Sequence, residues 1–185
     1  GCMSLGTEES KAIALIHEAL DRGVNLLDTA DLYDAHEQEV QVCQPLFRPF
    51  GGKGRFCGPA ATVMVYEDNV LVKEALETLP SGSVLIVDGG GSTRCALLGD
   101  NLASIAVRRG LAGIIINGCV RDVAELSKMP IGILAIASNP RKSSKQGRGQ
   151  RDIPLSFGGV LWQPGHWVYA DEDGILVAPR PLHQA

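Results

Sequence analysis

Apolar residues along the middle of the chain come in short runs, which alternate with glycine turns and with stretches of helical spacing. The short runs predict strands at residues 60–66, 83–87, 113–117 and 131–137. The intervening stretches predict helices that end near residue 78 and that span residues 99–109 and 121–128. Strands that alternate with helices in this way indicate a parallel sheet covered by helices.

The two ends of the chain follow other patterns. Near the C-terminus, glycine turns separate three further runs and predict a β meander with strands at residues 153–160, 167–170 and 175–178. Near the N-terminus, helical spacing predicts a helix at residues 8–22. We therefore expect an N-terminal extension over residues 1–28 and one domain over residues 29–185.

Composition places the chain among globular proteins of one domain. It has 185 residues, of which 45% are hydrophobic and 5% aromatic, and no run approaches the roughly 20 apolar residues of a membrane-spanning helix. A net charge of −4 disfavours direct binding to nucleic acid or to an anionic membrane. Five cysteines without a Cys-x-x-Cys pair, and no secretion-signal pattern, favour a cytoplasmic protein without disulfides or zinc.

Two turns combine residues that suit an anionic ligand. Gly99 lets a ligand approach the backbone at the start of a predicted helix, where free amides and the helix dipole favour a carboxylate. Arg121 and Asp122 follow a buried strand, and such a pair suits a keto acid together with a hard divalent cation. Spacing alone favours ordinary helix starts at both turns, with Asp122 stabilising the helix dipole and Arg121 exposed to solvent.

Two other segments each allow two interpretations. The glycine cluster at residues 88–92 resembles a nucleotide or methyltransferase loop, but no acidic residue about 20 positions later ends a strand, which favours a tight crossover turn. Residues 141–151, here called the basic segment, carry five positive charges and no acidic residue. The basic segment is either a loop that faces an anion or RNA, or a solvated connection or subunit contact, and no aromatic residues interleave with its charges.

From residue 29 to 179 the chain resembles the RraA-like family, which includes ribonuclease regulators and class II 4-hydroxy-4-methyl-2-oxoglutarate aldolases. The resemblance is carried by ADLYD at 30–34, FGG at 50–52, EDN at 67–69, VDGGGS at 87–92, ALLGDNLA at 96–103, GCVRDV at 118–123, FGGV at 157–160 and YAD at 169–171. These motifs are spread over about four fifths of the chain, so the resemblance does not depend on any one short match.

The resemblance implies an α/β fold of the swivelling β/β/α type, similar to phosphohistidine domains, assembled as a homotrimer or a hexamer. It implies a divalent-metal-dependent lyase that cleaves 4-hydroxy-4-methyl-2-oxoglutarate to pyruvate, with oxaloacetate decarboxylation as a side activity. The alternative is a non-enzymatic regulator that inhibits a ribonuclease E-type partner. Regulators of this family can lack the acidic residue after the arginine, so Arg121 followed by Asp122 favours the enzyme.

Site roles follow from the same resemblance. Gly99, Asp100, Asn101 and Leu102 are expected to bind the keto-acid substrate, and Arg121 to bind and polarise it. Asp122 is expected to bind Mg²⁺ or Mn²⁺, and Asp100 to help remove the proton of the substrate hydroxyl. Cys119 lies near these positions in sequence without a histidine neighbour, so we expect a buried structural thiol.

Residues 23–33 also resemble the segment of aldo-keto reductases that carries their catalytic aspartate and tyrosine. Those enzymes need an eight-fold βα barrel of about 250 residues. The chain is too short for such a barrel, so no reductase activity is predicted.

Overall fold

The computed structural model describes residues 28–182, so the helix predicted at residues 8–22 lies outside the described residues. The helices are α2 (Thr29–His36), α3 (Val70–Thr78), α4 (Asp100–Arg109) and α5 (Val123–Leu126). The strands are β1 (Gln41–Val42), β2 (Arg48–Pro49), β3 (Phe56–Val65), β4 (Val84–Asp88), β5 (Ala96–Leu98), β6 (Gly113–Val120), β7 (Gly132–Ser138), β8 (Gly149–Arg151), β9 (Leu155–Phe157), β10 (Val160–Trp162), β11 (Trp167–Ala170) and β12 (Ile175–Ala178). Within this part of the chain, no helix is long and apolar enough to cross a membrane.

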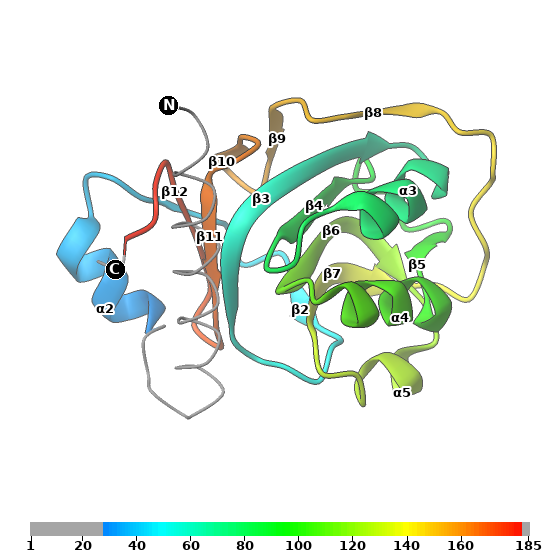
Figure 1. Ribbon diagram of the computed structural model, residues 1–185, viewed down its shortest axis with the longest axis horizontal. Coiled ribbons are helices and arrows are strands. Elements are labelled where there is room, and N and C mark those ends of the chain that lie inside the picture. The colour runs from blue at the N-terminus through cyan, green and yellow to red at the C-terminus, as the bar shows by residue number, and fades with distance from the viewer. Residues whose placement is uncertain (1–27, 183–185) are drawn as a thin grey trace, which may run out of the picture.

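A curled sheet of ten strands forms the centre of the molecule, with the main strand order β1-β12-β11-β3-β4-β6-β7-β2 (Figure 1). The pairs β3–β4, β4–β6 and β6–β7 are parallel, which confirms the sheet predicted from alternating strands and helices. Their residues are buried on both faces, and so these strands appear in the sequence as continuous apolar runs.

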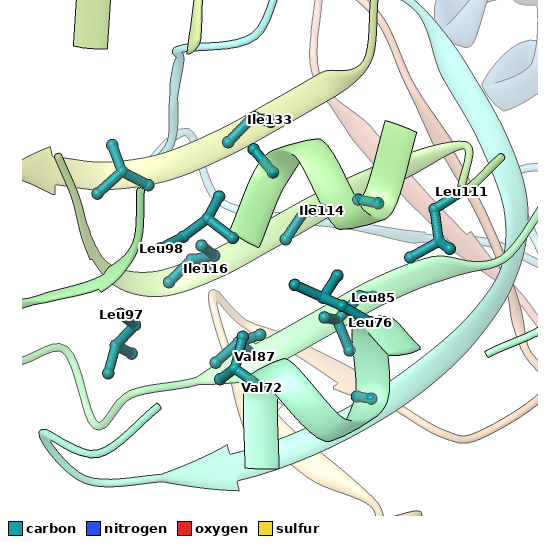
Figure 2. Close-up of a cluster of buried hydrophobic side chains, with 14 of the residues drawn as sticks. Val72, Leu76, Leu85, Val87, Leu97, Leu98, Leu111, Ile114, Ile116 and Ile133 are labelled. Atoms are coloured by element: carbon teal, nitrogen blue, oxygen red, sulfur yellow. The ribbon is translucent and has the colours of Figure 1, made fainter. Parts of the chain in front are cut away.

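Successive residues of the parallel strands pack into two different cores. Leu85, Val87, Ile114 and Ile116 pack beneath α3 and α4 (Figure 2). Val84, Ile86 and Ile115, on the other face, pack against β10, β11 and β12. Helices therefore cover one face and strands the other, which confirms the α/β class as a mixed single domain with a curled sheet.

β3 joins the two halves of the sheet. Its residues 56–59 pair with β11 in antiparallel orientation, whereas residues 60–64 pair with β4 in parallel orientation. β11 and β12 bury their outer face beneath α2, where Leu32 and Tyr33 pack on Tyr169 and Leu176. Thr29, at the start of α2, also bonds through its hydroxyl to the Asp171 carboxylate at 2.6 Å.

Two of the predicted elements are wrong in extent. The single strand predicted at residues 153–160 is two strands, β9 and β10, because Gly158 and Gly159 adopt positive φ values of 63° and 74° and form a hairpin turn. The helix predicted at residues 121–128 is the four-residue α5, because Asp122 lies in the left-handed region with φ 55° and cannot continue a helix.

Other differences concern strand ends and very short strands. β3 begins four residues before the predicted start, and β6 continues three residues beyond the predicted end. β1, β2, β5 and β8 have two or three residues each and were not predicted. Strands this short have no measurable periodicity, so their pairing partners decide where they form.

Candidate active site

A cleft of about 620 Å³ lies at the carboxyl ends of the parallel strands. One side of it is lined by Asn69 and by α3, and another by the end of β5 and the start of α4. Arg121, which follows β6, and the basic segment, which follows β7, complete the lining. In sheets with parallel strands, ligands bind at this edge because loops and helix N-termini converge there. The cleft is therefore the candidate functional site.

The N-terminus of α4 provides backbone donors to the cleft. Gly99 is the N-cap residue, and the Asn101 amide donates to the Asp100 carboxylate at 2.7 Å. The Leu102 amide, also in the first turn, has no hydrogen-bond partner within residues 28–182. An unpaired first-turn amide at the positive end of a helix dipole favours a bound carboxylate.

Arg121 and Asp122 lie directly beside this helix start. The Arg121 amide donates to the Leu98 carbonyl at 2.9 Å and so extends the β5–β6 pairing toward Gly99. Nε of Arg121 lies 3.4 Å from Oδ2 of Asp122, and the Asp100 amide donates to the same oxygen at 3.4 Å. The structure thus brings together Gly99, Asp100 and Arg121 at the cleft, as the sequence predicts, with Asp122 in contact with them.

Asp122 has the donor chemistry that a divalent cation requires. Its side chain is 35% exposed, and its two polar contacts are long, so its carboxylate keeps free lone pairs. Magnesium is commonly held by one or two protein carboxylates together with waters and substrate oxygens. The residues present therefore fit a cation bound by Asp122 next to Arg121, although Asp122 itself borders the cleft and does not line it.

A cluster of three aspartates elsewhere in the molecule could also hold a cation, but it lies away from the cleft. Carboxylate oxygens of Asp28, Asp171 and Asp173 lie within 4.8 Å of one another. The Asp28 carboxylate already accepts the amides of Ala30 and Asp31 at the start of α2. The Asp171 carboxylate accepts from Thr29, Asp173 and Gly174, so these residues organise turns.

Several cleft residues were not predicted as site residues. Asn69 faces the cleft, and its amide group donates to the Leu97 carbonyl at 3.2 Å. Lys73 lines the wall formed by α3, where it pairs with Glu77 at 3.6 Å. Lys142, Ser143 and Lys145 line the opposite wall. The signals in the sequence were the EDN run at residues 67–69 and the five charges of the basic segment, which therefore faces the cleft in part.

The glycine turn at residues 88–92 has no amide left for a phosphate. Gly89 and Gly91 donate to the Asn117 carbonyl, Gly90 to the Asp88 carboxylate, and Ser92 to the Gly89 carbonyl. The Asp88 carboxylate also accepts from the Asn117 side chain at 2.9 Å. The geometry agrees with a tight crossover turn and argues against a nucleotide loop at this position.

Cys119 is buried within β6, as expected, and burial raises the pKa of its thiol. A raised pKa keeps the thiol protonated near neutral pH, and a protonated thiol is a poor nucleophile. We therefore place Cys119 in the core and outside the chemistry of the cleft.

The fold and the cleft define a class: a single-domain α/β protein with a cleft at the carboxyl edge of a curled sheet, where a helix N-terminus, an arginine and two lysines of the basic segment converge. The profile of the RraA-like family, described as Aldolase/RraA, matches residues 29–177, and the chain belongs to this family. A relative from Bacillus cereus, provisionally named 4-hydroxy-4-methyl-2-oxoglutarate aldolase, is 57% identical over 84% of this chain and 98% of its own length. A relative from Burkholderia multivorans with the same provisional name is 53% identical over 83% of this chain and 97% of its own length.

Solved structures agree with this assignment. One from Geobacillus kaustophilus, described as an S-adenosylmethionine: 2-dimethylmenaquinone methyltransferase, is 60% identical with a TM-score of 0.84 and covers 84% of this chain and 97% of that chain. Another, described as the RNA-processing inhibitor RraA from Thermus thermophilus, is 48% identical with a TM-score of 0.81 and covers 83% of this chain and 93% of that chain. The family thus carries three different functional descriptions, and the residues of the cleft have to discriminate among them.

Proposed function

We propose that the protein is a divalent-metal-dependent class II aldolase that cleaves 4-hydroxy-4-methyl-2-oxoglutarate to pyruvate, with oxaloacetate decarboxylation as a side activity. The observation that carries the proposal is the contact of Arg121 and Asp122 with the open N-terminus of α4 at the edge of the cleft. The provisional aldolase name of relatives at 53 and 57% identity supports it.

Each residue has a distinct task in the proposed reaction. First-turn amides of α4, that of Leu102 above all, bind the substrate carboxylate next to the keto group. Arg121 donates hydrogen bonds to the keto oxygen, where negative charge develops as the bond between C3 and C4 breaks. The hydroxyl group on C4 passes its proton to a water molecule held by Asp100, and the C4–O bond becomes a keto group as the C3–C4 bond breaks. The C3 enolate then takes a proton, so that one substrate gives two pyruvates.

A cation held by Asp122, Mg²⁺ or Mn²⁺, would act as a Lewis acid and stabilise the enolate charge by several kcal/mol. Without the cation, Arg121 would supply a single positive charge close to the enolate oxygen. The salt bridge to Asp122 keeps the guanidinium oriented toward the start of α4. Lysine is a poor substitute for Arg121 because it lacks the planar fork of donors.

The test measures pyruvate release from 4-hydroxy-4-methyl-2-oxoglutarate and from oxaloacetate, with Mg²⁺, with Mn²⁺ and with a chelator. We expect turnover that depends on the metal, and a loss of about 100-fold or more in kcat in Asp122→Asn. Asparagine is chosen because φ at this position is 55°, a conformation that asparagine tolerates better than alanine does.

Glu125→Gln is the matched control for this variant. Glu125 lies on α5, the short helix that Asp122 precedes, is 58% exposed and pairs with Lys128 at 2.9 Å, so its loss removes a carboxylate without touching the cleft. We expect wild-type kinetics in this control. Full activity of a folded Asp122→Asn protein, or turnover that survives the chelator, would remove the metal role from Asp122.

The alternative function is that of a protein regulator of RNA processing. The similarity to the Thermus RraA structure, at 48% identity, favours it. If folded protein with added metal releases no pyruvate from either substrate, the regulator becomes the better assignment. Binding to the catalytic region of a ribonuclease E-type enzyme is then the next measurement.

A further inference from the structure

Asp68 places a buried negative charge beside the cleft. Among the described residues, the buried polar side chains are Thr29, Thr62, Ser83 and Asp68, and only the last of these ionises as a carboxylate. Asp68 is 1% exposed and lies in the turn between β3 and α3, directly before the cleft residue Asn69. A buried charge is costly unless hydrogen bonds compensate it, so its contacts indicate what it is for.

The compensating bonds come mainly from the basic segment. Oδ1 of Asp68 accepts the Val70 amide at 2.9 Å. Oδ2 accepts the Ser144 hydroxyl at 3.3 Å, the Gly147 amide at 3.1 Å and the Gln146 amide. The Ser144 amide donates to the Glu67 carbonyl at 2.7 Å, and the single proton of the Ser144 hydroxyl is shared between this carbonyl, at 2.8 Å, and Oδ2 of Asp68. Residues 144–147 are thereby fastened to a turn that lies more than 75 positions earlier in the chain.

Asp68 suits this task better than a neutral residue. All four groups around it are donors, and a carboxylate accepts through both oxygens, whereas an asparagine would present an amide donor to some of them. Burial alone raises the pKa of Asp68, but the hydrogen bonds from Val70, Gln146, Ser144 and Gly147 outweigh burial and hold the pKa below its ordinary value. Asp68 is therefore ionised near neutral pH.

The fastened residues carry the lysines of the cleft. Lys145 lies between Ser144 and Gln146, which both bond to Asp68, and it lines the cleft together with Lys142. At the other end of this stretch, the Arg141 carbonyl accepts the Ala96 amide at 2.8 Å. Hydrogen bonds thus hold residues 141–147 at both ends of the stretch that contains Lys142 and Lys145.

We propose that Asp68 is a positioning residue that holds Lys142 and Lys145 of the basic segment against the cleft, so that the site binds doubly charged keto acids in preference to singly charged ones. Asp68 does not touch the substrate and acts through the backbone of residues 144–147. The preference for dicarboxylates rests on the proposed function, whereas the placement of the basic segment does not.

The experiment compares Asp68→Asn with Asp171→Asn in the full chain. Asp171 is a matched control because its carboxylate also accepts from a hydroxyl and from amides, at Thr29, Asp173 and Gly174, away from the cleft. Trypsin cleavage after Lys142 and Lys145 under native conditions measures the placement of the basic segment. We expect cleavage to be about tenfold faster in Asp68→Asn, because hydrogen bonds to a charged group are lost, and unchanged in Asp171→Asn.

Kinetics and binding give the second readout. We expect KM for the dicarboxylate substrate to rise about tenfold in Asp68→Asn with kcat within about twofold, and calorimetry with oxalate to show the same loss of affinity. Ser144→Ala, which removes one of the bonds to Asp68, is expected to show smaller changes of the same sign and covers the case in which Asp68→Asn does not fold.

Unchanged trypsin cleavage in folded Asp68→Asn, or in Ser144→Ala if that is the variant that folds, would overturn the proposal. Faster cleavage with an unchanged affinity for oxalate would overturn the link to ligand binding. If wild type releases no pyruvate, the proposed function fails, while trypsin and oxalate still decide whether Asp68 positions the basic segment.

Discussion

Gly99 provides space for the Arg121 and Asp122 side chains at the start of α4. A Cβ atom at this position would lie 2.5 Å from Oδ2 of Asp122 and 3.1 Å from Nε of Arg121. Its φ of −136° is one that any residue adopts, so the need for glycine comes from the neighbouring side chains and not from the backbone. A single missing methyl group therefore allows the charged pair to contact the helix.

We predict that Gly99→Ala folds normally but loses about 100-fold in kcat/KM, because the added methyl displaces the Asp122 carboxylate and a shift of about 1 Å at a reacting group has that effect. Gly174→Ala is the control, since a Cβ there would meet nothing within 4 Å. Melting temperature and pyruvate release are measured on both variants. Wild-type kinetics in Gly99→Ala would mean that Asp122 does not act from the position described.

At the residue scale, the sequence predicts the part of the site that follows directly from strand ends. Gly99 and Arg121 both come after buried strands, and strands that pair in parallel bring such positions to one edge. Asn69 and Ser143 were not predicted, because their places depend on how α3 and the basic segment cross the sheet. The fastening of that segment to Asp68 is a contact over about 80 residues and leaves no local pattern.

Phe56 shows how β3, β6 and β7 fit together at the other end of the sheet. Gly113 and Gly132 are register partners on β6 and β7, and a Cβ at either one would overlap the Phe56 ring. Phe56 is 3% exposed, so its ring fills the space that the two glycines leave open. An aromatic ring packed over glycines in this way stabilises strands that glycine alone would weaken.

We predict that Gly132→Ala lowers the free energy of unfolding by about 1–3 kcal/mol, since overpacking forces the ring or the backbone to move. Denaturant unfolding measures this loss. Phe56→Leu in the same chain is expected to recover part of it, because the smaller side chain makes room for the methyl group. Strictly additive losses in the double variant would contradict the packing explanation.

At the element scale, patterned segments were predictable and unpatterned ones were not. β4, β6 and β7 have long apolar runs, and α4 has helical spacing and Gly110 as its stop in the left-handed conformation. The hairpin of β9 and β10 was predicted as one strand because an apolar residue lies on each side of Gly158 and Gly159. Only pairing in three dimensions decides that the chain reverses there.

Charge is divided unevenly over the whole molecule. The basic segment carries five positive charges, which leaves a net charge of −9 on the rest of the chain. Lys142 and Lys145 of this segment line the cleft together with Arg121 and Lys73. Three acidic residues, Glu74, Glu77 and Asp100, also line the cleft, so its four positive charges exceed its negative charges by one. An acidic protein with a slightly positive cleft attracts small anions to that cleft through interactions that salt screens.

We predict that KM for a dicarboxylate substrate rises about threefold between about 0.1 and 1 M sodium chloride, because the screening length falls from about 10 to 3 Å. Lys145→Gln is expected to reduce this dependence on salt. Lys128→Gln, which removes a charge paired with Glu125 outside the cleft, is expected to leave it unchanged. A KM that does not respond to salt in the wild type would contradict the electrostatic role of the basic segment.

The division of β3 between two partners has a consequence for how the chain is made. Residues 60–64 pair with β4, 24 positions later, but residues 56–59 pair with β11, more than 100 positions later. During synthesis on the ribosome, the first four residues of this strand therefore stay unpaired until almost the whole domain has been made. Unpaired edges recruit other chains, so this topology favours rapid closure of β3 on β11 once β11 has left the ribosome.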